Sequence, residues 1–397
     1  MQMTPTALQR IRQDAPSLDE MLFMLSCGAS IMPQPVVNVM AKYLELEARV
    51  GGYGAAERNA DSLSGVYDSV ARLINAERNE IALVENATVA WQMAFYSMQF
   101  RRGDRILTVE AEYAANYVAF LQARKRYGVS IEVIPSGPTG ETDLDALERM
   151  IDSRVKLIAV TWVPTNGGLT NPAEAIGQIA NRHGIPYLLD ACQAVGQMPV
   201  DVRQLKCDFL TATSRKFLRG PRGVGFLYAR AESMARLEPF SIDHFAAPWT
   251  SREEYTLRND ARRFETWESN LGAHLGLGAA VEYALSVGLE VIQSRCCSLS
   301  DRLRNGLREF SGITVLDLGT RPCAIVSFVH NHLPAAEVVK ACATRNLFIG
   351  ASNGASTRID AERRGLVEIL RAAPHYFNTE EEVDRTLAVI AEVLEIL

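Results

Sequence analysis

Two residues of this chain combine the type and the spacing that catalysis requires, Asp190 and Lys216. Asp190 ends the apolar run 187–190, and Lys216 comes four residues after the apolar run 209–212, and such runs are typical of buried strands. The stretch 220–225 then holds three glycines and one proline, which require a tightly folded backbone just after the lysine. A single aspartate or lysine is most often a surface residue, but the strand context and spacing of this pair favour a shared site.

These residue types are the ones that the cofactor pyridoxal 5′-phosphate (PLP) requires. A lysine amine condenses with the cofactor aldehyde, and an aspartate keeps the pyridine nitrogen protonated so that the ring accepts electrons. A phosphate is bound by backbone N–H groups, hydroxyls and a cation. Thr213, Ser214 and Arg215 offer such groups directly before Lys216. The residues therefore predict a PLP site in which Lys216 carries the cofactor and Asp190 faces the pyridine nitrogen.

The same region resembles the class V aminotransferase-fold enzymes, which include cysteine desulfurases, selenocysteine lyases and isopenicillin N epimerase-like proteins. Their motif Asp–x–x–Gln, followed by Ser–x–His–Lys, is matched at Asp190, Gln193 and Lys216. Thr213 replaces the serine, and Arg215 replaces a histidine that usually touches the phosphate. The resemblance implies PLP-dependent transferase fold type I, with Gln193, Thr213 and Arg215 at the cofactor.

The resemblance also assigns roles to residues outside this motif. It implies that Ala87 and Thr88 hold the phosphate where a helix follows a strand, and that the ring of Tyr113 stacks on the pyridine. It implies that Asn166 reaches the phenolic oxygen of the cofactor or the substrate. It further implies that Arg371 binds the substrate α-carboxylate, a bidentate task that suits a guanidinium group. Tyr113 is also a candidate donor of a proton to a leaving sulfur.

A further segment, 263–270, resembles one that crosses the dimer interface in this family, where a threonine caps the phosphate of the partner. The resemblance, which covers about residues 20–395, therefore implies a homodimer with active sites at the interface. Glu268 stands at the threonine position, where a carboxylate beside a phosphate is unfavourable, so the sequence leaves the role of Glu268 open. Arg219 and Arg222 could bind an acidic substrate or cover the dimer surface.

The reaction class depends on a missing cysteine. Desulfurases of the family carry a cysteine on a loop before the carboxylate-binding arginine, but the comparable stretch 348–358 contains none. The runs 356–360 and 375–379 resemble the hercynylcysteine sulfoxide lyases of ergothioneine biosynthesis, which are β-eliminating C–S lyases. The prediction is therefore a PLP-dependent C–S lyase that converts an S-substituted cysteine or its sulfoxide to pyruvate and ammonia. A cysteine desulfurase or selenocysteine lyase, an epimerase or aminotransferase, and a non-catalytic PLP-fold module are the alternatives.

The elements that must position these residues follow from the hydrophobic pattern. Seven apolar runs between residues 81 and 228 alternate with helical patterns, which predicts an α/β large domain with a mainly parallel seven-stranded sheet. In such sheets, ligands bind at the carboxyl ends of the strands. A long apolar helix over about 276–292 and a final helix from Glu381 indicate a smaller C-terminal α+β domain. We predict a large domain over 1–255 and a small domain over 256–397.

The composition of the chain indicates which kinds of partner it is expected to bind. The 397 residues carry a net charge of -6, which gives no reason to expect a nucleic acid or an anionic membrane as partner. No run of about 18 apolar residues occurs. The seven cysteines are scattered, which is typical of a reducing compartment and predicts a cytoplasmic protein. His330 and His332 lack a third ligand, so no metal site is predicted, and the expected partner is a small amino-acid substrate.

Overall fold

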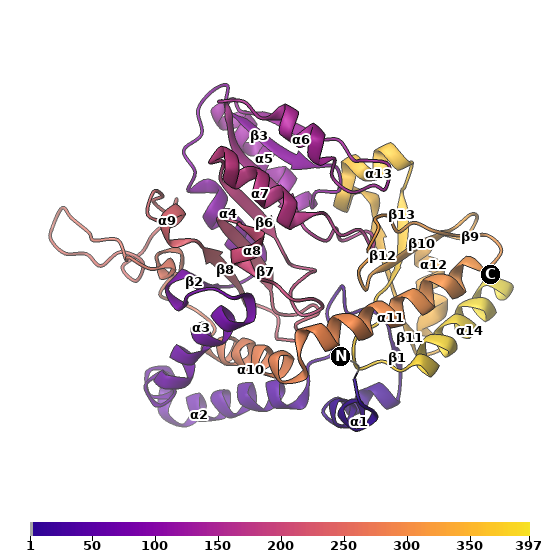
Figure 1. Ribbon diagram of the computed structural model, residues 1–397. Helices are drawn as coiled ribbons and strands as arrows, with labels where there is room; N and C mark the ends of the chain where they lie inside the picture. The colour runs from indigo at the N-terminus through magenta and orange to yellow at the C-terminus, as the bar shows by residue number, and fades with distance from the viewer. Residues whose placement is uncertain (1–2) are drawn as a thin grey trace.

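The computed structural model describes residues 3–397 (Figure 1). Its largest sheet has seven strands in the order β2-β8-β7-β6-β5-β3-β4. The strands are β2 (Ile81–Val84), β3 (Arg105–Val109), β4 (Ser130–Ile134), β5 (Val155–Thr161), β6 (Tyr187–Asp190), β7 (Phe209–Thr213) and β8 (Gly225–Ala229). The neighbours from β7 to β4 are parallel, and β8 is antiparallel to both β7 and β2. The predicted α/β fold with a mainly parallel seven-stranded sheet is confirmed.

Helices cover both faces of this sheet. Along β5, Leu157 and Ala159 belong to one apolar cluster, whereas Ile158 and Val160 belong to another. The first cluster includes α4 (Ala87–Tyr96) and α5 (Ala114–Tyr127), and the second includes α3 (Ala60–Ile74), α6 (Leu144–Met150), α7 (Ala173–His183) and α10 (Leu271–Val287). Burial on both faces explains why the central strands β5, β6 and β7 are largely apolar in the sequence.

The carboxyl ends of β2, β3, β5, β6 and β7 meet at one edge of the sheet, because these strands run in the same direction. Helix α4 begins at this edge, where the side chain of Asn86 accepts a hydrogen bond from the Val89 N–H group at 3.0 Å. Gly225 lies beside this helix start. A Cβ atom on Gly225 would come within 2.4 Å of the Ala212 carbonyl oxygen and 3.2 Å of the Ala87 nitrogen, so the close approach of β8 to α4 requires glycine.

The smaller C-terminal unit contains an antiparallel sheet in the order β12-β13-β10-β9. Its elements are α11 (Leu289–Arg308), β9 (Ile313–Val315), β10 (Val326–His330), α12 (Ala335–Ala343), β11 (Leu347–Phe348), β12 (Gly350–Asn353), η4 (Gly354–Thr357), α13 (Arg358–Arg364), β13 (Glu368–Ala372) and α14 (Glu380–Ile396). The apolar sides of α11, α12 and α14 form one cluster with β10 and β13. The N-terminal segment joins this unit, because β1 (Leu22–Phe23) pairs in parallel with β11.

The prediction of one helix over about 276–292 is wrong. The chain forms two helices, α10 and α11, that meet at Gly288 and are bent by 79°. Gly288 has φ +92°, a backbone conformation that glycine adopts readily and that breaks the helix. Within residues 3–397, no single helix is long and apolar enough to cross a membrane, and only this bent pair meets both criteria together.

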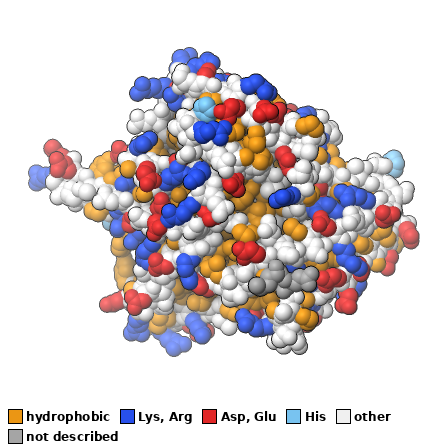
Figure 2. Space-filling view, viewed as in Figure 1, with side chains coloured by type: hydrophobic (Ala, Val, Ile, Leu, Met, Phe, Trp, Pro, Cys, Tyr) orange, Lys and Arg blue, Asp and Glu red, His pale blue; other side chains and the backbone are white. Residues whose placement is uncertain are grey.

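Helices α2 (Gln34–Arg58) and α10 lie below the large sheet in Figure 1. Helix α10 packs against α2 and α3, and its side chains belong to the cluster that covers the large sheet. Since α10 packs with the large sheet and much of α11 packs in the small unit, the chain runs from the large unit into the small unit near Gly288. The predicted division at residue 255 stays a prediction. Figure 2 shows acidic and basic side chains interspersed over one face of the molecule.

Candidate active site

A cavity of about 430 Å³ opens where the carboxyl ends of the strands meet the start of α4. Residues that are far apart in the sequence line it together. They are Asn86, Ala87, Thr88, Val89, Tyr113, Asn116, Thr161, Val163, Thr165, Asp190, Cys192, Gln193, Thr213, Arg215 and Lys216. The lining includes every predicted cofactor residue except Asn166. The edge of a parallel sheet therefore brings these side chains to one place, as the strand pattern predicts.

Asp190 is buried at the end of β6, and both carboxylate oxygens have donors. The Cys192 N–H group donates to Oδ1 at 3.0 Å, and Asn116 Nδ2 donates to Oδ2 at 3.0 Å. The same Asn116 nitrogen donates to Glu112 Oε1 at 2.8 Å. From the sequence, no role was assigned to Asn116 or Glu112, which lie four residues apart across the start of α5.

Glu112 is buried next to Asn116. Its carboxyl group also accepts hydrogen bonds from the backbone N–H groups of Tyr113, at 2.9 Å, and Thr161, at 3.1 Å. Burial raises the pKa of Glu112 to about 7, while hydrogen bonds from Thr161 and Asn116 act in the opposite direction. Glu112 thus fixes the amide of Asn116, which in turn faces Asp190.

Lys216 is half-buried in the loop that follows β7 and lines the cavity. Burial lowers the pKa of its amine from the ordinary value, and the neighbouring charge of Arg215 lowers it further, although Cys192 and Asp190 act against this. A lowered pKa increases the fraction of neutral amine at neutral pH. A neutral amine is the form that condenses with an aldehyde or removes a proton, so the surroundings of Lys216 suit both tasks.

The part of the cavity lining at the start of α4 suits an anion. The first N–H groups of α4, those of Ala87 and Thr88, have no partner within the helix, and the helix dipole favours negative charge there. Thr213 adds a hydroxyl group and half-buried Arg215 adds a cation. Arg215 is held in place because its Nη1 donates to the carbonyl oxygen of Gly28.

Asn166 and Arg371 lie just behind the cavity wall. Asn166 Nδ2 donates to Thr357 Oγ1 at 3.0 Å, and its Oδ1 is buried without a hydrogen-bond partner among the described residues. Arg371 Nη1 donates to both the carbonyl oxygen and Oγ1 of Thr165 at 2.8 Å, and its Nε likewise has no partner within residues 3–397. Thr165 itself lines the cavity. Both predicted substrate contacts therefore keep unused hydrogen-bonding groups next to the cavity.

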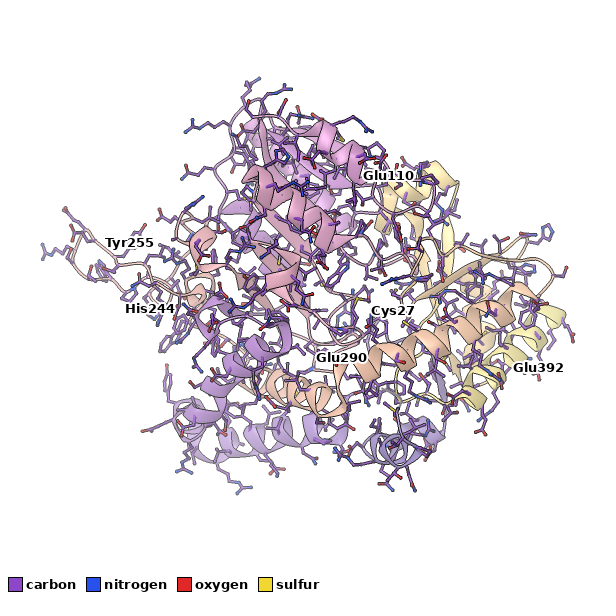
Figure 3. The ribbon with its side chains drawn as sticks, in the orientation of Figure 1. Cys27, Glu110, His244, Tyr255, Glu290 and Glu392 are labelled. Carbon is purple, nitrogen blue, oxygen red and sulfur yellow. The ribbon has the colours of Figure 1, made fainter. Side chains whose placement is uncertain are left out.

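Gln193 also has a buried side-chain atom that makes no hydrogen bond within the described residues. Its Nε2 donates to the carbonyl oxygen of Cys27 at 3.1 Å, whereas its buried Oε1 has no partner among the described residues. Cys27 lies between the two sheets (Figure 3). Buried polar groups are usually paired, so several unpaired groups around one cavity indicate a polar ligand. An aldehyde-binding amine, an aspartate and an anion site in one cavity, together with these unpaired groups, fit PLP.

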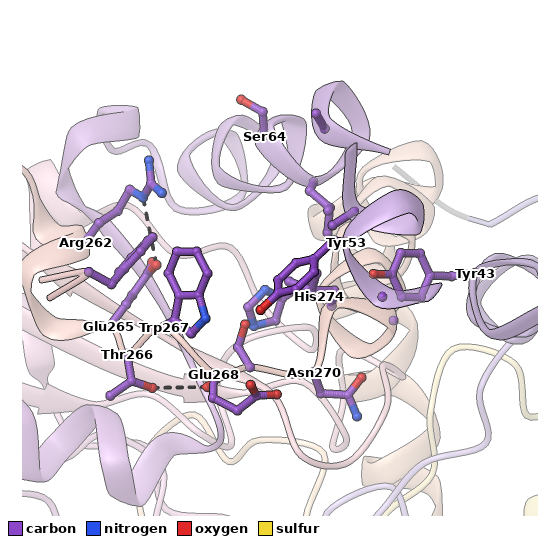
Figure 4. Close-up of a pocket in the computed structure, with 18 of the residues that line it drawn as sticks. Tyr43, Tyr53, Ser64, Arg262, Glu265, Thr266, Trp267, Glu268, Asn270 and His274 are labelled. Atoms are coloured by element: carbon purple, nitrogen blue, oxygen red, sulfur yellow. Dashed lines mark hydrogen bonds and ion pairs between the residues drawn. The ribbon is translucent and has the colours of Figure 1, made fainter. Parts of the chain in front are cut away.

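Glu268 does not line this cavity. It lines a second and larger cavity of about 970 Å³ between α2, α3 and the segment 265–270. Figure 4 shows the rings of Tyr53, Trp267 and His274 around it. Glu268 is therefore away from the anion site of its own chain.

Fold and cavity together define a PLP-dependent enzyme. Residues 22–386 match the family model described as aminotransferase class V, and the chain belongs to this family. The protein is accordingly a PLP-dependent lyase of the class V aminotransferase family.

Its relatives include cysteine desulfurases. The chain is 29% identical over 392 residues to a probable cysteine desulfurase of Methanothermobacter thermautotrophicus, covering 97% of this chain and 96% of that protein. It is 28% identical over 422 residues to a cysteine desulfurase of Klebsiella pneumoniae, covering 98% and 99%. The apo cysteine desulfurase of Thermococcus onnurineus NA1 has a TM-score of 0.92 at 27% identity and covers 100% of both chains. A cystine C–S lyase in complex with its reaction product cysteine persulfide shares the fold, with a TM-score of 0.86 at 21% identity over 95% and 99% of the two chains.

Proposed function

We propose that this protein cleaves the Cβ–S bond of a cysteine-derived amino acid by β-elimination, without passing the sulfur to a cysteine of its own. The observation that carries the proposal is the composition of the segment 348–358. Asn166 Nδ2 donates to Thr357 Oγ1 and, at 3.3 Å, to the carbonyl oxygen of Asn353, so this segment lies directly behind the cavity. It contains no cysteine that could accept sulfur.

Cys192 is the cysteine among the residues that line the cavity, and it is a poor acceptor. Burial raises the pKa of its thiol strongly, and the carboxylate of Asp190 raises it further. Sulfur acceptance requires a thiolate, which a raised pKa disfavours. The chemistry of Cys192 thus supports elimination over persulfide formation.

When bound, PLP supplies an electron sink for the pair of electrons left at Cα. The neutral amine of Lys216 takes the Cα proton, and Asp190 holds the proton on the pyridine nitrogen. Arg371 binds the substrate carboxylate through the groups that it does not use on Thr165. Burial raises the pKa of Tyr113, so its hydroxyl stays protonated and can donate to the sulfur as the Cβ–S bond breaks. Hydrolysis of the released enamine gives pyruvate and ammonia.

A second candidate, a cysteine desulfurase, is favoured by the names of the relatives, since the Klebsiella pneumoniae protein and the Thermococcus onnurineus structure carry that name. This reaction would yield alanine and leave sulfur on an enzyme cysteine. The two candidates therefore differ in product and in their need for a cysteine.

The test supplies the PLP-loaded protein with L-cysteine, S-substituted cysteines and their sulfoxides, hercynylcysteine sulfoxide included, and measures pyruvate, alanine and sulfide. We expect pyruvate from a sulfoxide or S-conjugate without added keto acid, and an unchanged rate in Cys192→Ser. Lys216→Ala is the inactive control. Alanine together with protein-bound persulfide would contradict the proposal and establish the desulfurase. Racemised substrate or a keto-acid-dependent reaction would identify an epimerase or aminotransferase.

A further inference from the structure

The backbone just after Lys216 is held by a segment near the C-terminal end of the chain. Phe217, Leu218 and Arg219 are buried. His375 Nε2 lies 2.6 Å from the carbonyl oxygen of Phe217, and Arg219 Nη1 donates to the hydroxyl oxygen of Tyr376 at 2.9 Å. The residue that follows the cofactor-binding lysine is thus anchored to a distant part of the fold.

The partners of His375 determine which nitrogen of its ring carries the proton. The Phe217 carbonyl oxygen can only accept, so Nε2 must donate. Burial lowers the pKa of His375 to about 3, and the charge of Arg219 lowers it further, so the ring is neutral. Nδ1 is then an acceptor, and Cys296 Sγ, at 3.4 Å, donates its S–H to it. The ring therefore has one fixed tautomer and one fixed orientation.

Arg219 also holds the loop after Lys216 against the C-terminal segment. Its guanidinium lies 4.7 Å from the ring centre of Phe377 and 5.1 Å from that of Tyr376, and Nε donates to the Ile31 carbonyl oxygen at 2.8 Å. No carboxylate among residues 3–397 lies within ion-pair distance of it, so the aromatic faces, the Ile31 carbonyl oxygen and the Tyr376 hydroxyl oxygen stabilise its charge. Arg219 does not cover a dimer surface, because its side chain is 1% exposed, and it is not among the residues that line the active-site cavity.

The same C-terminal segment reaches the substrate side of the cavity. Arg371, on β13, precedes His375 by four residues and is bound to Thr165 in the cavity wall. One short segment thus contacts both the wall near Arg371 and the loop of Lys216. The position of this segment therefore sets the distance between Arg371, the predicted binding group for the substrate carboxylate, and the amine of Lys216.

We propose that His375 is a positioning residue for Lys216. Its Nε2–H fixes the Phe217 carbonyl and with it the Phe217–Leu218 peptide plane, one residue after Lys216. This restrains the backbone that carries Lys216 and so the direction of the lysine amine in the cavity, and Arg219 keeps the loop in place. Placement of a reacting group within a fraction of an ångström is worth large rate factors. The inference rests on the proposed role of Lys216 as cofactor attachment point and is independent of the substrate.

Two amide variants isolate the hydrogen bond. In His375→Gln the amide nitrogen can reach the Phe217 carbonyl oxygen, whereas in His375→Asn the same group is one methylene shorter and falls short. The measurements are the pH midpoint of the absorbance band at about 420 nm from lysine-bound PLP, and the rate at which cofactor-free protein develops this band after PLP is added. For His375→Asn we expect a midpoint shift of about half a pH unit or more and band formation about fivefold slower or more. His375→Gln should stay close to the unmodified protein.

Controls separate positioning from stability and from the role of Lys216. Leu303→Ala, in the apolar cluster of the small unit, should lower the unfolding temperature and leave the titration unchanged. Lys216→Ala should lose the band; a retained band would refute the attachment point and not the role of His375. Equal shifts in the Gln and Asn variants, or no shift in either, would overturn the proposal. If His375→Asn does not fold, Tyr376→Phe decides. Loss of its hydroxyl removes the hydrogen bond from Arg219 and should also shift the midpoint away from that of the unmodified protein, and an unshifted midpoint would overturn the proposal.

Discussion

Glu112 is a buried carboxyl group that does not line the active-site cavity but holds a residue that does. It holds Asn116, and Asn116 donates to Asp190. Its folded-state pKa of about 7 lies above the ordinary value of 4.5, mainly because of burial. A carboxyl group with a raised pKa binds its proton more tightly in the folded protein, so its contribution to stability is fully present below the unfolded pKa and is lost as the pH rises towards the folded pKa.

Glu112→Gln should therefore change the pH dependence of unfolding in the cofactor-free protein. Between pH 4.5 and about 7, the unmodified protein should lose stability relative to the variant, by at most about 1.4 kcal/mol per pH unit. Urea unfolding at several pH values measures the difference. The variant also loses an acceptor for the backbone N–H groups of Tyr113 and Thr161, so it starts from a lower stability. Parallel pH profiles for the two proteins would show that Glu112 does not titrate in this range.

At the scale of elements, the start of α4 combines a structural and a functional requirement. Asn86 caps the helix, and the next two N–H groups line the anion end of the cavity. Thr379 caps α14 in a comparable way, since its Oγ1 accepts from the Glu382 N–H group at 3.0 Å, but α14 lies in the small unit. The two capping residues make the same kind of hydrogen bond, but only Asn86 lines the cavity, so Thr379 can serve as its control.

Asn86→Ala and Thr379→Ala should each cost about 1 kcal/mol of unfolding free energy. Only Asn86→Ala should also weaken the binding of PLP, because fraying of the first turn of α4 misplaces the N–H groups of Ala87 and Thr88. Urea unfolding and a PLP titration followed by absorbance measure the two effects. An equal PLP affinity in both variants would argue against the phosphate site at α4.

At the scale of the whole molecule, the second cavity bears on the predicted homodimer, which stays a proposal, as does the cytoplasmic location. Tyr53 and Trp267 line this cavity and are 84% and 53% exposed. Large exposed aromatic side chains around one hollow are typical of a surface that another protein covers. The resemblance of 263–270 to an interface segment makes a second copy of this chain the expected partner.

Trp267→Arg should therefore shift the protein from dimer to monomer in sedimentation velocity at a fixed concentration. Tyr127→Arg, at the end of α5 and outside the residues that line this cavity, is the control and should remain dimeric. A monomeric unmodified protein would refute the homodimer. A dimer that persists in Trp267→Arg would place the interface on another surface.

Much of the fold and of the candidate site could be predicted because the signals are local. Most strands of the large sheet are short apolar runs; Asp190 ends one of them, and Lys216 lies three residues after another. The rule that parallel strands end at one edge then brings Asp190, Thr213 and Lys216 together without further information. The bend between α10 and α11 does not follow from the sequence, because the apolar pattern of α10 continues past Gly288 through Leu289, Val291 and Ile292, and a single glycine does not always end a helix.

The sequence by itself determined the cofactor chemistry, because a lysine and an aspartate after buried strands need no distant contact to be recognised. Only the tertiary structure decided the contacts that hold them. Asn116 and Asp190 are 74 residues apart, and Phe217 and His375 are 158 residues apart, and no local pattern pairs residues at such separations. The burial of Arg219 among aromatic rings was equally beyond the sequence, since an arginine beside a glycine-rich loop is normally exposed. Side chains close to a strand end follow the backbone pattern, whereas hydrogen bonds between the two units depend on how those units pack.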